Sequence, residues 1–284
     1  MEIVDTVAML DQKAERLRQI LAGCGRLIVA YSGGVDSAFL AWTAHQVLGG
    51  QMLAVIADSA SLARTHLEDA LAFAREREIP LEVVETQELE NPAYTRNDAM
   101  RCFHCKDELF TVLGRYCEGR GFDAIAYGVN AADEGDFRPG QQAARQHGVL
   151  APLLEAGLNK AEIRELARQA ELRVWDKPAS ACLSSRMEYG RAVTPKALSV
   201  IERGEDALRA MGFRQFRVRH HGEIVRIEIA REEFPRALTA EMAREFTAVF
   251  KALGFKFVTL DLEGFRSGSM NQLLTAEQLL RGRI

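Results

Sequence analysis

The chain has 284 residues, of which 48% are hydrophobic and 27% are charged, a composition close to that of an ordinary globular protein. This length allows one large domain or two ordinary ones, each with a sizeable core. The net charge of −4 and the isoelectric point near 6.0 argue against a strongly basic surface for nucleic acids. We therefore expect no nucleic-acid partner.

No stretch is long and apolar enough for a membrane span, and the first ten residues lack the charged-then-apolar pattern of an export signal. The five cysteines are an odd number, so a disulfide framework is not expected. We expect a cytoplasmic protein without a membrane partner, whose cysteines are buried, metal-bound or catalytic.

The first two thirds of the chain alternate between helical and strand patterns. We expect helices over residues 5–21, 37–48, 62–77, 105–117 and 159–170, and strands over 27–31, 52–57, 81–85, 123–128 and 150–153. Asn159 is the expected N-cap of its helix. Strands separated by helices of this length indicate an α/β protein with a doubly wound parallel sheet. Such sheets bind ligands at the carboxyl ends of their strands.

The pattern changes near residues 189–194. A helix over 195–211 precedes a β-hairpin of residues 213–219 and 223–230, with one apolar and one charged face. A long helix over about 231–253 and a strand over 257–262 follow. We expect two domains: residues 1–188 form the α/β domain, and residues 189–284 form a smaller α+β domain for substrate binding or oligomerisation.

Residues 32–37 read Ser-Gly-Gly-Val-Asp-Ser and lie between the first predicted strand and the next helix. Glycines allow close approach of the backbone, and amides at a helix N-terminus bind phosphate. The serine hydroxyls add donors, and Asp36 can hold the loop or a magnesium ion. The pattern predicts an ATP site made by Ser32, Gly33, Gly34, Val35, Asp36 and Ser37. The alternative is an ordinary strand–turn–helix connection.

Two further polar residues, Asp58 and Ser59, come directly after the second predicted strand. Parallel strands end at the same edge of their sheet, so these residues are expected to contact the same nucleotide.

Three of the five cysteines form a pattern of their own. Cys102 and Cys105 are spaced as Cys-x-x-Cys, and Cys182 can join them through the fold. Three thiolates suit a [4Fe–4S] cluster that keeps one iron open for an exogenous ligand. A structural zinc with His104 as fourth ligand, a redox disulfide, and small buried residues are the alternatives.

The nucleotide loop resembles that of the N-type ATP pyrophosphatases, which include NAD synthetase, GMP synthetase and tRNA thiolases. It lacks the Gly-Lys-Ser/Thr of a Walker loop, which argues against cleavage of the γ-phosphate. The resemblance implies that ATP is split between its α- and β-phosphates. Residues 101–106 (Arg-Cys-Phe-His-Cys-Lys), 176–186 (Asp-Lys-Pro-Ala-Ser-Ala-Cys-Leu-Ser-Ser-Arg) and 218–228 (Val-Arg-His-His-Gly-Glu-Ile-Val-Arg-Ile-Glu) add a more specific likeness. Together these motifs resemble the LarE family of sulfur transferases.

The resemblance implies a reaction and its cofactors. LarE enzymes use ATP and Mg²⁺ to adenylate the carboxylates of pyridinium-3,5-biscarboxylate mononucleotide and convert them to thiocarboxylates, for the nickel-pincer cofactor of lactate racemase. Some members sacrifice the cysteine that matches Cys182, whereas others have all three cysteines and hold a [4Fe–4S] cluster. All three are present here, so the cluster form is expected, with Cys102, Cys105 and Cys182 as its ligands. Pathway proteins are expected partners, and the family implies a homo-oligomer.

The resemblance also assigns roles to single residues. Cys182, Asp36 and Ser37 are the expected catalytic residues. Arg217 and Arg219, joined by Arg226 on the facing strand, are expected to bind the substrate phosphate; a charged solvent face is the alternative.

Lys177 and Arg186 lie near Cys182 in the sequence and either assist its thiolate or carry ordinary surface charge. A tRNA thiolase, an amidating enzyme similar to NAD synthetase, and a nucleotide sensor with structural zinc are the competing functions.

Overall fold

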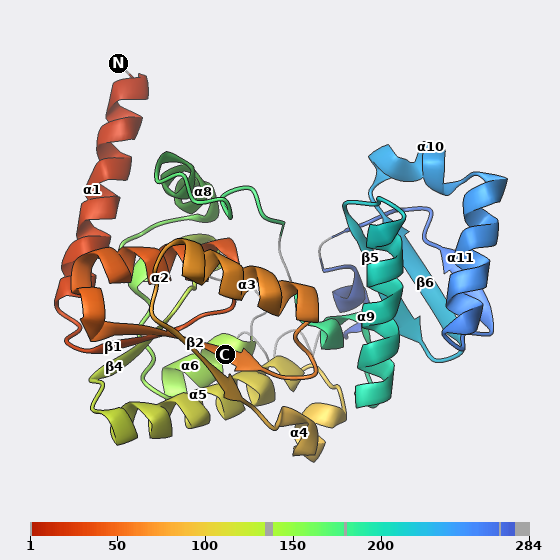
Figure 1. Cartoon of the computed structure of the whole chain (residues 1–284), viewed down its shortest axis with the longest axis horizontal. Helices are drawn as coiled ribbons and strands as arrows, with labels where there is room; N and C mark the ends of the chain where they lie inside the picture. The colour runs from red at the N-terminus through yellow and green to blue at the C-terminus, as the bar shows by residue number, and fades with distance from the viewer. Residues whose placement is uncertain (1, 134–138, 179–180, 267, 276–284) are drawn as a thin grey trace.

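The larger sheet has four parallel strands in the order β3-β2-β1-β4 (Figure 1). The computed structural model describes residues 2–133, 139–178, 181–266 and 268–275. The strands are β1 (Leu27–Ala30), β2 (Met52–Asp58), β3 (Leu81–Glu85) and β4 (Ala124–Tyr127). The chain runs outward from β1 to β3 and then returns to the other side of β1. The doubly wound parallel sheet is therefore confirmed, and its order reverses between β1 and β4.

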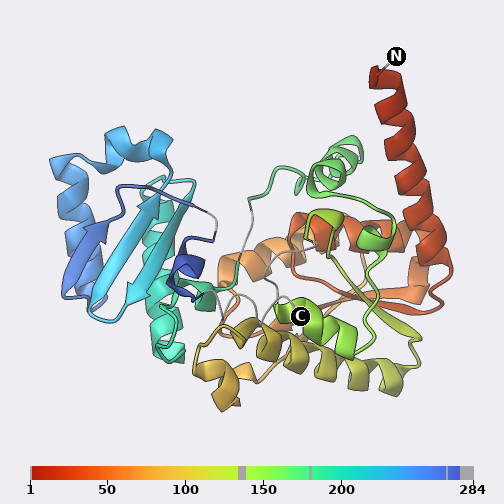
Figure 2. The same cartoon turned by 180° about the vertical axis from the view of Figure 1, so that it is seen from behind.

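Helices cover both faces of this sheet (Figures 1 and 2). One layer contains α1 (Glu2–Ala22), α2 (Val35–Leu48), α3 (Arg64–Glu76) and α8 (Lys160–Gln169), and the other contains α5 (Arg101–Arg120) and α6 (Pro139–Gln146). Successive side chains of a strand point to opposite faces. Leu27 and Val29 accordingly pack under the first layer, whereas Ile28 and Ala30 pack under the second.

The expected strand over residues 150–153 is wrong. Leu150 makes a single bridge to Ala126, and a short helix, α7 (Pro152–Glu155), begins two residues later. Pro152 has no N–H for a ladder, while its fixed φ favours the first turn of a helix. Another short helix, α4 (Pro92–Thr95), begins in the same way.

The smaller sheet has the order β5-β6-β7. Its strands β5 (Phe216–His221) and β6 (Ile224–Ile229) form the expected antiparallel hairpin, and β7 (Phe257–Leu260) is parallel to β6. Gly222 turns the hairpin with a φ of 71°, a conformation that suits glycine. Helix α9 (Pro195–Ala210) leads into this sheet.

The expected long helix over 231–253 is also wrong, because the chain breaks it into α10 (Phe234–Ala237) and α11 (Ala240–Ala252). Pro235 fits only the start of a helix. Thr239 then caps α11, since its hydroxyl accepts a hydrogen bond from the Met242 amide at 3.2 Å.

The core of the smaller sheet includes residues from the first part of the chain. Ala63, Tyr94 and Leu183 belong to the same buried cluster as Phe216 and Val218 of β5. Residues far apart in sequence are therefore packed together between the two sheets. A domain boundary at 188 and 189 stays a prediction.

Candidate active site

The Ser32–Ser37 loop follows β1, and its last three residues form the first turn of α2. This helix begins two residues earlier than expected. Gly33 has a φ of 70°, and a Cβ there would lie 2.6 Å from the Cβ of Ala70. The Ser32 amide donates to Ser37 Oγ at 3.1 Å, and the two hydroxyl oxygens are 3.0 Å apart. Gly34 is the N-cap and provides no side-chain cap. The first amides of α2 are thus suited to an anion.

The end of β4 presses against this helix start. A Cβ on Gly128 would lie 2.7 Å from the Ser37 backbone nitrogen, which only glycine allows. The loop therefore lies at the point where the strand order reverses, which is the usual ligand position in such sheets.

Lys160 contributes a cation that the sequence interpretation missed. Its Nζ donates to Asp36 Oδ2 at 2.5 Å. Asn159 and Glu162 form a capping box that fixes the start of α8 and hence the position of Lys160. The sequence does show Asn159 and Lys160 at the start of a helix, but it does not show that Lys160 pairs with a residue 124 positions away.

Lys177 contacts the backbone of the nucleotide loop. Its Nζ donates to the Gly33 carbonyl at 3.1 Å and contacts Asp69. Burial raises the pKa of Asp69, but hydrogen bonds from Lys177 and Arg173 outweigh it and lower that pKa. The expectation that Lys177 is ordinary surface charge is wrong, because its side chain is mostly buried; its assistance to Cys182 stays a prediction.

Asp58 and Ser59 lie at the same edge, after β2, and both have partners in the protein. Arg64 Nη1 lies 2.6 Å from Asp58 Oδ1, and Arg64 Nη2 donates to the Ser59 carbonyl at 2.8 Å. Their contact with a nucleotide stays a prediction.

Cys182 is held at this edge by its neighbour. The Leu183 amide donates to the Ser61 carbonyl at 2.8 Å, which ties the segment to the chain just after β2. Ser184 is fully buried; its hydroxyl lies 2.5 Å from the Tyr94 hydroxyl. Arg101, at the start of α5, donates to the Ser184 carbonyl at 2.8 Å. Cys182 and the nucleotide loop therefore share one edge of the sheet.

The other two cysteines lie on α5. Cys102 is exposed, whereas Cys105 is partly covered by the core of the smaller sheet. Burial raises the pKa of the Cys105 thiol, and negative charge on Cys182 and Cys102 raises it further. Cys105 therefore lies within electrostatic reach of both Cys182 and Cys102. All five cysteines are free thiols.

The three thiols match the donor chemistry of an iron–sulfur cluster. In the described part of the chain, however, no three His, Cys, Asp or Glu side chains are placed to hold one metal ion. The cluster accordingly stays a prediction that rests on the kind and nearness of the donors.

The charged face of the hairpin is largely buried. Arg219 Nη2 donates to Glu228 Oε2 at 2.8 Å, and Arg226 Nη2 donates to Glu228 Oε1 at 3.2 Å. The Ser269 hydroxyl also contacts both Arg219 and Glu228. The charged face is therefore an organised network covered by a segment 40 to 50 residues further along the chain.

Arg217, on the same strand, is partly buried among charged side chains of both signs. Burial lowers the pKa of its guanidinium to about 10, and repulsion by Arg186 and Arg219 contributes despite Glu205 and Glu228. Its guanidinium also lies 5.0 Å from the centre of the Phe265 ring. An anionic ligand would offset the cost of burying this guanidinium.

Arg186 is buried, so the expectation of ordinary surface charge is wrong, while its assistance to the Cys182 thiolate stays a prediction. Its side chain is 1% exposed and forms a bidentate ion pair with Glu205. Burial raises the pKa of Glu205, but the Arg186 guanidinium outweighs this and lowers it.

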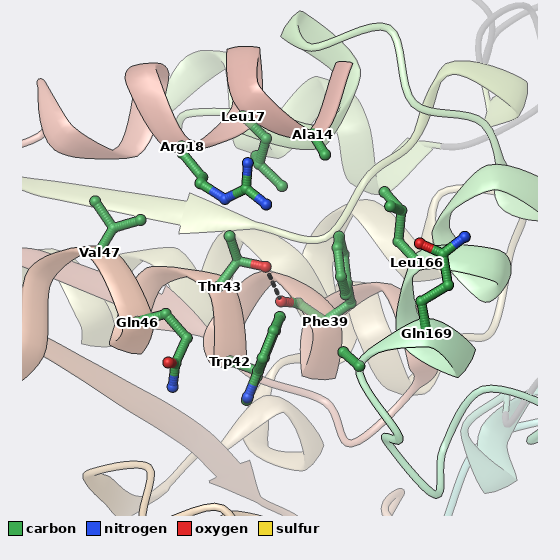
Figure 3. A pocket seen from close by; sticks show the side chains of 11 residues that line it. Ala14, Leu17, Arg18, Phe39, Trp42, Thr43, Gln46, Val47, Leu166 and Gln169 are labelled. Carbon is green, nitrogen blue, oxygen red and sulfur yellow. Dashed lines mark hydrogen bonds between the residues drawn. The ribbon is translucent and has the colours of Figure 1, made fainter. Parts of the chain in front are cut away.

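A separate pocket of about 250 Å³ lies between α1, α2 and α8 (Figure 3). Phe39, Trp42 and Leu166 contribute its apolar walls, and the Thr43 hydroxyl at its edge donates to the Phe39 carbonyl. None of the candidate site residues lines this pocket.

Comparison with known proteins gives a partial and a nearly full-length match. The NAD synthase family model matches residues 9–103. Pyridinium-3,5-bisthiocarboxylic acid mononucleotide synthase from Lactiplantibacillus plantarum is 33% identical over 96% of this chain and 99% of its own length. The chain belongs to the LarE family. The predicted resemblance is thereby confirmed.

Two other relatives of this chain carry no assigned activity in their names. An uncharacterized protein from Synechocystis sp. is 42% identical over 94% of this chain and all of that protein. Another, from Methanocaldococcus jannaschii, is 27% identical over 85% of this chain and 91% of its own length. The family places the chain among the enzymes related to NAD synthase. Within the described ranges, every helix is too short or too polar to cross a membrane.

Proposed function

We propose that this LarE-family protein is an ATP-dependent sulfur transferase that converts the carboxylates of pyridinium-3,5-biscarboxylate mononucleotide to thiocarboxylates. The observation that carries the proposal is the bond from the Leu183 amide to the Ser61 carbonyl, which holds Cys182 at the sheet edge that carries the nucleotide loop. The name of the Lactiplantibacillus plantarum relative specifies the product class. The proposed product serves the nickel-pincer cofactor pathway of lactate racemase.

The first step activates a carboxylate. A substrate carboxylate oxygen attacks the α-phosphorus of ATP, the bond to the β-phosphate oxygen breaks, and pyrophosphate leaves. The loop amides and the hydroxyls of Ser32 and Ser37 neutralise charge on the leaving group. Lys160, fixed beside Asp36, adds a cation at the same place. A magnesium ion would be held by Asp36 and phosphate oxygens, and it supplies further charge neutralisation.

The second step transfers sulfur. A sulfur nucleophile attacks the acyl carbon of the adenylate, and AMP leaves with the former carboxylate oxygen. Cys102, Cys105 and Cys182 would hold a [4Fe–4S] cluster, whose open iron presents sulfide when the cluster is bound. The protein itself fixes Cys182 through Ser61, Tyr94 and Arg101.

The substrate phosphate is bound by Arg217 and Arg219, with Arg226 as support. Arg217 and Arg219 lie two residues apart on β5 and so share one face of the strand, which supports this interpretation because one phosphate can accept hydrogen bonds from both guanidiniums. Glu228 holds Arg219 and Arg226 in fixed orientations, so little side-chain freedom is lost when the phosphate binds.

The experiment uses anaerobically purified protein with ATP, Mg²⁺, sulfide and the biscarboxylate substrate. We expect substrate-dependent release of AMP and pyrophosphate together with a thiocarboxylate product in mass spectra. Ammonia in place of sulfide is the matched control, because an amidating enzyme would give an amide. Pyrophosphate release without substrate dependence, or an amide product, would refute the proposal.

A further inference from the structure

The segment that carries Cys182 is attached to a buried ion pair. Arg186 Nε donates to Glu205 Oε1 at 2.9 Å, and Nη2 donates to Glu205 Oε2 at 3.1 Å. The two side chains are 1% and 6% exposed. A buried charge of this kind is stable only while its partner and its other hydrogen bonds remain in place.

The remaining nitrogen of Arg186 binds the cysteine segment itself. Nη1 donates to the Cys182 carbonyl at 2.8 Å and to Ser185 Oγ at 3.1 Å, and it also contacts the Ala181 carbonyl. The Ser185 hydroxyl donates in turn to the Cys182 carbonyl at 2.7 Å. The backbone on both sides of the Cys182 side chain is therefore fixed by one guanidinium.

Glu205 extends this connection to the hairpin. Its Oε1 accepts a hydrogen bond from the Val218 amide at 3.3 Å, between Arg217 and Arg219 on β5. A second link runs from Arg219 Nη1 to the Ser185 carbonyl at 3.1 Å. The cysteine segment and the strand with the phosphate-binding candidates are thus joined by two short chains of hydrogen bonds.

We infer that Glu205 and Arg186 are positioning residues that hold the sulfur-donating Cys182 segment at a fixed place relative to the phosphate-binding strand β5. A substrate held by its phosphate then presents its activated carboxyl group to the sulfur. Such alignment matters because small misplacements of reacting atoms have large effects on rate. This inference rests on the proposed function, and neither residue contacts the reacting atoms.

The test variant is Glu205→Gln, which keeps the side-chain shape and removes the charge. Asp206→Asn is the matched control on the same helix, because Asp206 forms an ion pair with Arg209 in which both side chains are more than 40% exposed. Glu205→Asp keeps the charge and serves as the conservative variant if Glu205→Gln folds poorly.

Single-turnover reactions measure pyrophosphate release and thiocarboxylate formation separately. We expect Glu205→Gln to slow thiocarboxylate formation about 100-fold, while pyrophosphate release changes less than about threefold. Glu205→Asp should restore most of the sulfur transfer, and Asp206→Asn should match the unmodified protein. Equal loss of both steps in Glu205→Gln would overturn the positioning role.

Hydrogen exchange gives a second measurement that needs no substrate. The amides of Leu183, Ser185 and Met187 all donate within or next to the cysteine segment. We expect these amides to exchange at least about tenfold faster in Glu205→Gln, and at unchanged rates in Asp206→Asn. Unchanged exchange in Glu205→Gln would overturn the inference. If the unmodified protein transfers no sulfur, the proposed function fails, and the exchange rates still decide whether Glu205 holds the segment.

Discussion

The two charged regions of the candidate site differ in how they are held. At the nucleotide loop, Asp36 and Lys160 form an ion pair whose side chains are 17% and 38% exposed. On the hairpin, Glu228 is fully buried and Arg219 is 6% exposed. An exposed pair is weak and exchanges partners easily, whereas a buried network is costly to disturb. The comparison indicates that the ion pair at the nucleotide loop is the more accessible to solvent, while the charged network at the proposed phosphate site is already formed.

Cys182 lies between these regions, so its replacement should give the largest effect. We expect Cys182→Ser to abolish sulfur transfer and to leave pyrophosphate release near its original rate, because attack on the α-phosphorus needs only the loop and its ligands. Separate assays of pyrophosphate and thiocarboxylate measure the two steps. Cys24→Ser is the control, since that thiol precedes β1, at the end of the strand opposite the nucleotide loop, and donates to the Ile20 carbonyl. Loss of both steps would contradict the separation of the two regions.

The double variant Cys102→Ser and Cys105→Ser distinguishes sulfur transfer through a cluster from sacrifice of the Cys182 sulfur. If the three thiols share a cluster, this variant loses its iron, its visible absorbance and sulfur transfer together. If Cys182 is sacrificed, transfer persists and Cys182 loses the elements of H₂S, as measured by intact-protein mass spectrometry. Full transfer in the double variant would exclude the cluster form.

At the nucleotide loop, Asp36→Asn should slow pyrophosphate release about 100-fold, because Lys160 and the magnesium ion lose their carboxylate partner. Substrate binding through the arginines should change little. Asp107→Asn is the control. Asp107 lies on α5, away from the loop, and pairs with His147, which follows α6. An equal loss of substrate affinity in Asp36→Asn would show that the regions are not independent.

On the hairpin, Arg217→Ala should weaken substrate binding by about 2 kcal/mol, the usual effect of losing charge-assisted hydrogen bonds. Calorimetric titration measures the affinities for substrate and ATP, and we expect the ATP affinity to stay the same. Arg214→Ala, at an exposed position before β5, is the control. Equal weakening of both ligands would assign Arg217 to the nucleotide.

The pKa of His66, on α3, is affected by charged side chains from both regions. Burial, with repulsion by Lys177 and Arg186, lowers its pKa from 6.5 to about 4 despite Glu205. Between these pH values the unfolded chain binds a proton and the folded protein does not, so the free energy of unfolding falls as the pH falls from 6.5 toward 4. We expect His66→Asn to reduce this loss by about 2 kcal/mol, as measured by urea unfolding. An unchanged pH slope would contradict the buried, neutral form of His66.

The sequence predicted what is encoded locally. The four strands of the larger sheet, the glycine loop after β1 and the Asn159 cap follow from neighbouring residues, and all three features are present. The two wrong elements failed because Pro152 and Pro235 start helices where an apolar run indicated a strand or a longer helix. Both prolines are present in the sequence, and a proline favours the first turn of a helix over the middle of a strand or a long helix.

What the sequence did not predict depends on contacts between distant residues. Lys160 meets Asp36 across 124 positions, and Lys177 meets Gly33 across 144. Arg186 belongs to the same sequence motif as Cys182, yet its partner is Glu205 on a distant helix. A pattern of residue types identifies the chemistry available, but it does not show which charged groups neutralise one another.

The mass of the small-molecule product tests the central claim most directly. After anaerobic reaction with ATP, Mg²⁺ and sulfide, the account predicts a biscarboxylate substrate in which sulfur has replaced carboxylate oxygen, formed together with AMP and pyrophosphate. Cys182→Ser should give AMP and pyrophosphate without this product. Recovery of unchanged substrate from the unmodified protein under these conditions would contradict the account.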